Sequence, residues 1–190
     1  MVLGGPHGKG DLMGSLNVLS LGKNGNITLG FDVKITDKQG MDFIVFENPF
    51  HLSAQQDQIY AELMYVEVST DGVNFARFPS ISNTPGPGLV HPDDVTNLAG
   101  VNSVYAHIDE NDIDPFNPDT SGGDAFDLSD LSNNPMVQSG IVDLQNINYI
   151  RLIDIVGDGS EFDSNGDPIY DVTDMDNGAD IDAISVINYT

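Results

Sequence analysis

Apolar and polar residues alternate with a period of two along the most regular stretch of this chain. The stretch is NITLGFDVKI, residues 26–35, and its apolar members are Ile27, Leu29, Phe31, Val33 and Ile35. A period of two places one set of side chains on each face of an extended strand. An amphipathic helix would need a period of about 3.6 residues. The pattern therefore predicts a half-buried β-strand.

Similar stretches recur through the sequence and predict further strands. The clearest are residues 41–48, 61–70, 147–156 and 181–188, with weaker candidates at 16–21 and 73–78. The Asp-Gly pair in TDGVN (70–74) predicts a tight turn between two of them. No amphipathic helix longer than about two turns is visible. We expect one all-β domain over residues 1–190, an antiparallel β-sandwich with two long connections, 79–140 and 157–180.

Negative charge is concentrated in the second half of the chain. The net charge is −24; residues 1–90 carry 9 acidic and 5 basic side chains, whereas residues 91–190 carry 21 acidic ones and a single base, Arg151. Nucleic acid and anionic lipid bind clustered Lys and Arg, so this surface repels both. No stretch approaches the ~20 apolar residues of a membrane helix. Nucleic acid and membrane insertion are therefore excluded.

The sequence carries no recognisable catalytic motif. It has no Cys, which excludes disulfides and thiolate metal sites, and its histidines form no H-E-x-x-H motif. A G-x-S-x-G nucleophile elbow is also absent. Among 30 acidic residues a glycosidase pair could be chosen at will, so no choice is informative. We expect no enzyme; a polysaccharide-active hydrolase is the less favoured alternative.

The second long connection has the spacing of a calcium loop. In GDGSEFDSNGDPIYD (157–171), Asp163, Asn165 and Asp167 alternate in a D-x-N-x-D pattern that matches the first half of an EF-hand-type loop. No helices flank it, so we predict a calcium loop in a β context; an ordinary Asp/Asn/Gly turn is the alternative. Because Ca²⁺ takes 6–8 oxygen ligands, Asp158 and Asp171 are added as candidates.

The first long connection contains DENDIDPFNPDTSGGDAFDLSD (109–130), with eight carboxylates and no Lys or Arg. One alternative is a solvated acidic loop. Apolar side chains are interleaved with the acids, however, and predict that parts of the segment pack onto the body: Phe116, Phe126, Leu128 and Leu131. Unpaired carboxylates are costly in such places. Bound Ca²⁺, favoured over Mg²⁺ because it accepts many flexible oxygen ligands, would offset that cost.

The predicted calcium ligands in and near this segment are Asp112, Asp114, Asp124 and Asp127, together with Glu47 and Asp182 at strand ends. Tyr105, Phe116 and Tyr170 lie in or beside loops and are the candidate contacts to a glycan. Each of these aromatic side chains could equally anchor its own loop to the core.

Several motifs resemble a known fold. VEVSTDGVNFARFP (66–79) resembles the strand–turn–strand unit of discoidin-type, galactose-binding-like jelly rolls, and INYIRLIDI (147–155) and DIDAISVIN (180–188) are similar to later strands of that fold. The order of GSLNVLSLGKNGNITLGF, DFIVFENPF, GGDAFDLSDL and DPIYD resembles a family of bacterial cell-surface proteins. Many members carry an export signal and an anchoring tail; MVLGGPHGKG has neither the basic nor the apolar region of such a signal.

The resemblance implies a jelly roll at the outside of a bacterium, a fold that often holds a structural calcium ion. We therefore expect a secreted or cell-surface module in which Ca²⁺ orders the acidic loops and which serves adhesion by binding glycan or another surface protein. Two alternatives are a small-ligand capture protein and a purely structural envelope protein. Fold alone does not choose among them.

Overall fold

Antiparallel β-strands supply nearly all the regular structure of the computed structural model, which describes residues 2–55, 57–172 and 178–190. In chain order the elements, with η for a 3₁₀ helix, are β1 (Leu19–Ser20), β2 (Asn26–Ile35), β3 (Phe43–Phe46), β4 (Met64–Ser69), β5 (Ala76–Arg77), β6 (Ile81–Ser82), η1 (Pro92–Asp94), β7 (Val95–Thr96), β8 (Leu98–Ala99), β9 (Asp124–Phe126), η2 (Leu128–Leu131), α1 (Pro135–Gln138), β10 (Ile147–Asp154), β11 (Asp158–Phe162), β12 (Pro168–Tyr170), β13 (Asp180–Ile181) and β14 (Ala183–Val186). In these described ranges no helix is long and apolar enough to cross a membrane.

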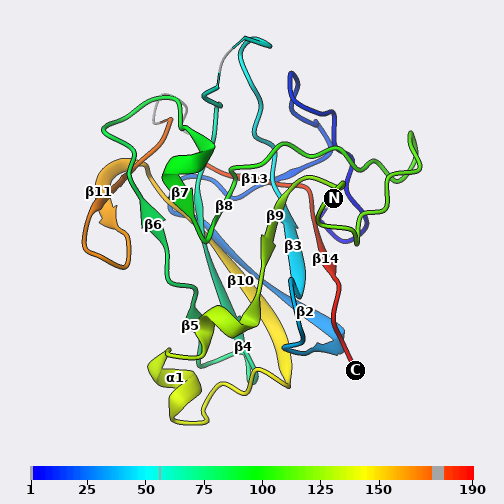
Figure 1. The fold of residues 1–190 in the computed structure, drawn as a ribbon, viewed down its shortest axis with the longest axis vertical. Coiled ribbons are helices and arrows are strands. Elements are labelled where there is room, and N and C mark those ends of the chain that lie inside the picture. The colour runs from blue at the N-terminus through cyan, green and yellow to red at the C-terminus, as the bar shows by residue number, and fades with distance from the viewer. Residues whose placement is uncertain (1, 56, 173–177) are drawn as a thin grey trace.

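Two larger sheets form the body of the protein (Figure 1). One has the order β2-β10-β4-β5, with β8 also paired to β4, and the other has the order β14-β3-β9. Three two-stranded sheets, β1-β13, β6-β7 and β11-β12, lie outside them. All of these pairings are antiparallel. The predicted all-β antiparallel class is confirmed, in a form with fragmented sheets and one short α-helix.

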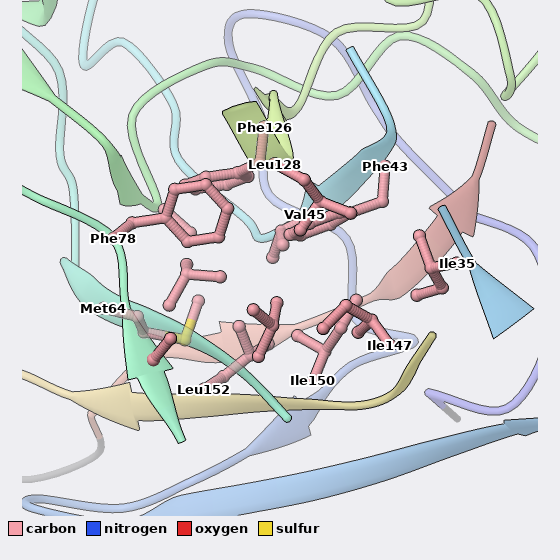
Figure 2. Close-up of a cluster of buried hydrophobic side chains, with 14 of the residues drawn as sticks. Ile35, Phe43, Val45, Met64, Phe78, Phe126, Leu128, Ile147, Ile150 and Leu152 are labelled. Atoms are coloured by element: carbon pink, nitrogen blue, oxygen red, sulfur yellow. The ribbon is translucent and has the colours of Figure 1, made fainter. Parts of the chain in front are cut away.

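The main hydrophobic core lies between the two larger sheets (Figure 2). Phe43, Val45 and Phe126 come from the three-stranded sheet, and Ile150 and Leu152 come from β10 of the other. The ring of Phe126 stacks on Phe43, with centroids 5.3 Å apart, and all five side chains are almost completely buried. Apolar burial of this kind is the dominant stabilising term in folding.

The predicted strands differ from the observed ones mainly at their ends. The stretch 26–35 is β2 over its full length, whereas the other predicted stretches contain shorter strands. TDGVN forms the turn of the β4-β5 hairpin. The connection 79–140 is not structureless, since it contains four short strands, two 3₁₀ helices and α1. Strands of two residues give too short an alternation for a sequence pattern to reveal.

The two arginines pair with a single buried carboxylate. Register places Glu67 of β4 opposite both Arg77 of β5 and Arg151 of β10. Arg77 Nε donates to Glu67 Oε1 at 2.8 Å, and Arg151 Nε donates to Oε2 at 2.6 Å. Since Arg151 is the only Lys or Arg after residue 91, its charge is engaged away from the acidic connections.

Candidate functional site

Three aspartates meet at one end of the β3-β9 strand pair. Register pairs Phe43 with Phe126, so Asp42, just before β3, lies opposite Asp127, just after β9. Asp37 lies just after the end of β2. One carboxylate oxygen from each of the three aspartates lies within 4.8 Å of the other two. This cluster, the Asp37–Asp42–Asp127 site, could hold a metal ion.

Asp42 is the buried centre of this site. Its Oδ1 accepts hydrogen bonds from Lys38 N at 3.1 Å and Asn188 Nδ2 at 2.9 Å, and its Oδ2 accepts one from Leu128 N at 2.9 Å. A carboxylate offers about four lone-pair positions, so one position is left for an ion. Burial, and to a smaller extent the charge of Asp127, raises the pKa of Asp42.

The other two aspartates are half-buried and more available. Burial raises the pKa of Asp37, and repulsion from Asp42 and Asp127 raises it further. Asp127 Oδ1 accepts a hydrogen bond from Ser129 N at 2.9 Å and caps η2. Two oxygens bound to one Ca²⁺, each at about 2.4 Å, can be up to about 4.8 Å apart. The spacing therefore allows one metal ion to contact all three aspartates, with water completing the coordination.

Sequence reasoning identified Asp127 but missed its two partners. Asp37 and Asp42 lie in the less acidic half of the chain and flank the turn sequence KQGM. Their proximity to Asp127 follows from the β3-β9 register, which single-sequence patterns do not specify. The density of acidic residues along the sequence points instead to residues 109–130.

The D-x-N-x-D segment forms the loop of the β11-β12 hairpin. Asp163 Oδ1 accepts hydrogen bonds from Asn165 N and Asp167 N, at 2.8 and 2.9 Å, and Oδ2 accepts one from Ser82 N at 3.0 Å. Partial burial works to raise the pKa of Asp163, but these hydrogen bonds outweigh it and lower the pKa. Asn165 and Asp167 are exposed. The main-chain amides thus close this loop, and calcium binding here stays a prediction.

Asp124 on β9 is also held by main-chain amides. Its Oδ2 accepts hydrogen bonds from Gly100 N and Val101 N at 2.8 and 3.0 Å, and Asn102 Nδ2 donates to Oδ1 at 2.8 Å. Burial raises its pKa to about 6, against these hydrogen bonds. Asp124 therefore fixes the 100–102 loop.

Acidic residues in the first part of the segment 109–130 are exposed, unlike the buried Asp124. Asp112 and Asp114 are exposed, and Asp114 Oδ1 accepts a hydrogen bond from Phe116 N at 2.9 Å. At the base of the loop, Lys9 Nζ lies 2.8 Å from a carboxylate oxygen of Glu110. The two parts of the acidic segment differ: its first part is solvated, and Phe126, Leu128 and Leu131 anchor its second part in the core.

A second acidic region surrounds the start of β4. Glu62, Asp154 and Asp171 line a cavity of about 10 Å³ that Lys23 also borders. Asp171 Oδ2 accepts a hydrogen bond from Leu63 N at 2.9 Å, yet burial raises its pKa to about 8, and the charges of Asp154 and Glu62 add to the shift. Burial likewise raises the pKa of Glu62 to about 7. Asp158 is exposed outside this cavity.

Glu47 and Asp182 are both buried, and each has one oxygen without a hydrogen-bond partner in the part of the chain that the structure describes. Asp182 Oδ2 accepts from His7 N at 2.6 Å, while its Oδ1 lies 3.6 Å from His7 Nδ1. Glu47 Oε1 accepts from Asp180 N at 2.9 Å, and its Oε2 is unpartnered. Burial raises the pKa of both carboxyls, well above the usual range for Glu47.

The three aromatic candidates occupy different settings. Tyr105 is 42% exposed and borders an open pocket of about 440 Å³, and its hydroxyl donates to Asp11 Oδ1 at 2.6 Å. That hydrogen bond, with burial, raises the pKa of Tyr105 to about 12. Phe116 is exposed on the solvated loop. Tyr170 is half-buried on β12 and lies close to Gly159 of β11. This position is typical of a side chain that anchors its own loop.

Comparison of the chain with protein-family models, with curated proteins and with solved structures finds no match.

Proposed function

We propose that the protein is a non-catalytic, calcium-binding module of the bacterial exterior that binds glycan. The observation that carries the proposal is the Asp37–Asp42–Asp127 site, whose oxygen spacing allows one Ca²⁺ ion to contact all three aspartates. An ion there joins the end of β2, the start of β3 and the end of β9. Those elements also position the 124–131 segment, so the ion would order the acidic connection that contains Asp127.

The architecture that goes with this proposal is a jelly-roll β-sandwich. The core shared by the β2-β10-β4 and β14-β3-β9 strands supports two face-to-face sheets. The motif order described above supports the jelly-roll connection of those sheets and a place at the cell surface. In this setting Ca²⁺ acts as a structural staple in a chain that has no Cys.

Calcium is expected to raise the free energy of unfolding of EDTA-stripped protein. With three protein carboxylates, one of them largely saturated by hydrogen bonds, we expect a dissociation constant on the order of 10⁻⁴ M, near the range of extracellular calcium modules. At 100 times that concentration the stabilisation is about 2.7 kcal/mol. Thermal unfolding with CaCl₂, MgCl₂ and NaCl at matched ionic strength measures it, and only CaCl₂ should give a saturable rise.

Matched variants locate the ion. Asp37→Asn and Asp127→Asn should each abolish most of the calcium response, because each removes one of the three anionic ligands. Asp32→Asn, on the exposed side of β2, makes the same charge change outside the site and should leave the response intact. A calcium response equal in all three variants, or one reproduced by NaCl, would contradict the assignment.

The pocket beside Tyr105 is the proposed glycan site. Its lining includes the polar residues Asn102, Asp119 and Thr120 together with Tyr105. Sugars present apolar C–H faces and hydroxyl groups, which an aromatic ring and fixed polar side chains bind together. Asp124 holds Asn102 in place through the 2.8 Å hydrogen bond, so this wall of the pocket is ordered before a ligand arrives.

Glycan binding is expected to depend on the Tyr105 ring. Screening calcium-loaded protein on a glycan panel should identify a ligand whose affinity falls about tenfold in Tyr105→Ala, which corresponds to about 1.4 kcal/mol. Tyr189→Ala removes a comparably exposed tyrosine outside the pocket and should bind as the unmodified protein does. Equal loss in both variants, or an absence of any glycan ligand, would remove sugar recognition from the proposal.

A further inference from the structure

A second pocket lies on the side of the molecule where β3 ends and β13 begins. Its volume is about 360 Å³, and its lining consists of Glu47, Asn48, Phe50, Leu52, Tyr60, Glu62 and Asp180. Pockets of about 300–1,000 Å³ are typical of small-molecule sites. The pocket shares no lining residue with the Tyr105 pocket and none with the Asp37–Asp42–Asp127 site.

The polar part of this lining is acidic. It contains three carboxylates, and in the described part of the chain no Lys, Arg or His lines the pocket. Asn48 is already engaged with the main chain of Ser15, which both donates to and accepts from its amide. Lys23 and Lys9 border adjacent cavities, which Glu62 and Glu47 also line, but neither lysine lines this pocket. When ionised, the carboxylates repel one another, and a cation in the pocket would relieve that repulsion.

Glu47 gives an independent sign of a missing partner. Its side chain is 3% exposed, and Oε1 accepts from Asp180 N, but Oε2 has no hydrogen-bond partner among the described residues. A buried polar atom without a partner costs free energy, and a buried charge costs more. Native proteins rarely leave such an atom unpaired. Because Glu47 lines the pocket, a donor bound there would be placed to supply the hydrogen bond that the described residues do not.

The spacing of the acids favours an organic cation over a metal ion. Among the described residues, the only acidic side chains with three ligand atoms within 4.8 Å of one another are those of the Asp37–Asp42–Asp127 site. Glu47, Glu62 and Asp180 are thus too far apart to converge on one ion without rearrangement. A larger cation with several N–H donors can reach carboxylates that are spread over a pocket of this size.

The remaining wall suits the alkyl part of such a ligand. The rings of Phe50 and Tyr60 stack with centroids 5.2 Å apart, and Leu52 is 58% exposed beside them. Aromatic faces attract ammonium groups, and apolar side chains cover methylene groups. One wall of the pocket therefore favours apolar groups and the other favours positive charge.

We propose that this pocket binds a primary alkylammonium group, with Glu47 and Glu62 as the anionic contacts and the Phe50–Tyr60 pair as the apolar wall. The group can belong to a free amine or to a lysine side chain on another protein. Both sources present the same –NH₃⁺ group on a flexible methylene chain.

The test is calorimetric titration of calcium-loaded protein, in about 10 mM CaCl₂ so that metal sites are filled. The probes are 1,5-diaminopentane and a short peptide with one central lysine, and the neutral controls are 1-pentanol and the same peptide with acetylated lysine. Saturable binding of either cationic probe, with none of its neutral control, supports the proposal. Binding of the diamine assigns the site to free amines, and binding of the peptide alone assigns it to a protein lysine.

Variants keep the test specific. Glu47→Gln preserves the acceptor for Asp180 N and Glu62→Gln changes a half-buried side chain; each should weaken binding about tenfold, or about 1.4 kcal/mol. Asp32→Asn, at an exposed residue of β2 that does not line the pocket, should bind with unchanged affinity, and circular dichroism checks that every variant is folded. The proposal would be overturned if neither cationic probe bound. It would also be overturned if both Gln variants bound the probe with the affinity of the unmodified protein.

Discussion

Phe126→Ala is expected to destabilise the protein by about 3–5 kcal/mol, the usual cost of deleting a buried phenylalanine. The side chain is 1% exposed, stacks on Phe43 and meets Phe78 edge-on with centroids 5.0 Å apart. Its removal opens a cavity in the core between the two larger sheets (Figure 2). Urea unfolding followed by circular dichroism measures the change in free energy.

Phe116→Ala is the matched control, because it removes the other phenylalanine of the acidic segment 109–130. Its side chain is 54% exposed, so we expect a change within about 0.5 kcal/mol. The contrast tests whether the second part of the segment belongs to the core while the first part is solvated. Comparable destabilisation by the two substitutions would contradict that division.

Calcium-free protein is expected to lose stability as the pH rises from about 5 to about 8, by on the order of 4 kcal/mol. Asp171, which is 1% exposed, makes a large contribution, because burial raises its pKa to about 8. Burial also raises the pKa of Glu47 well above its usual range, which acts in the same direction. In this pH range the unfolded state has released the Asp171 proton while the folded state retains it, so the folded state binds more protons and stability falls with pH. Glu62, with a pKa of about 7, acts in the same direction.

Asp171→Asn should remove much of this pH dependence. The amide oxygen can still accept from Leu63 N, as Asp171 Oδ2 does at 2.9 Å, while the buried charge is eliminated. We expect the variant to be more stable than the unmodified protein at about pH 8 and similar at about pH 5. Urea midpoints in EDTA across this range measure the effect.

An exposed substitution gives the control for this experiment. Asp119→Asn changes the same chemical group on the solvated loop and should leave the slope of stability against pH unchanged. If the unmodified protein and Asp171→Asn have the same slope, then Asp171 is not the group that titrates with folding.

The candidate sites were less predictable from the sequence than the fold class was. Charge density drew attention to residues 109–130, yet Asp112 and Asp114 are exposed there. The D-x-N-x-D spacing has a local explanation in the hairpin loop, where main-chain amides bind Asp163. Short motifs of Asp, Asn and Gly serve turns and calcium loops alike, because both need oxygen acceptors and tight backbone geometry.

The sequence by itself determined the antiparallel β class, the extent of β2, the absence of cysteine chemistry and the excess of acid in the second half. These properties depend on composition and on an alternation that a strand shows within a few residues. Only the tertiary structure decided which acids meet. Asp42 lies near Asp127 through strand register, and Glu47 Oε2 lacks a partner because the surrounding chain offers no donor among the described residues. Both outcomes depend on contacts between segments far apart in the sequence, which local periodicity does not encode.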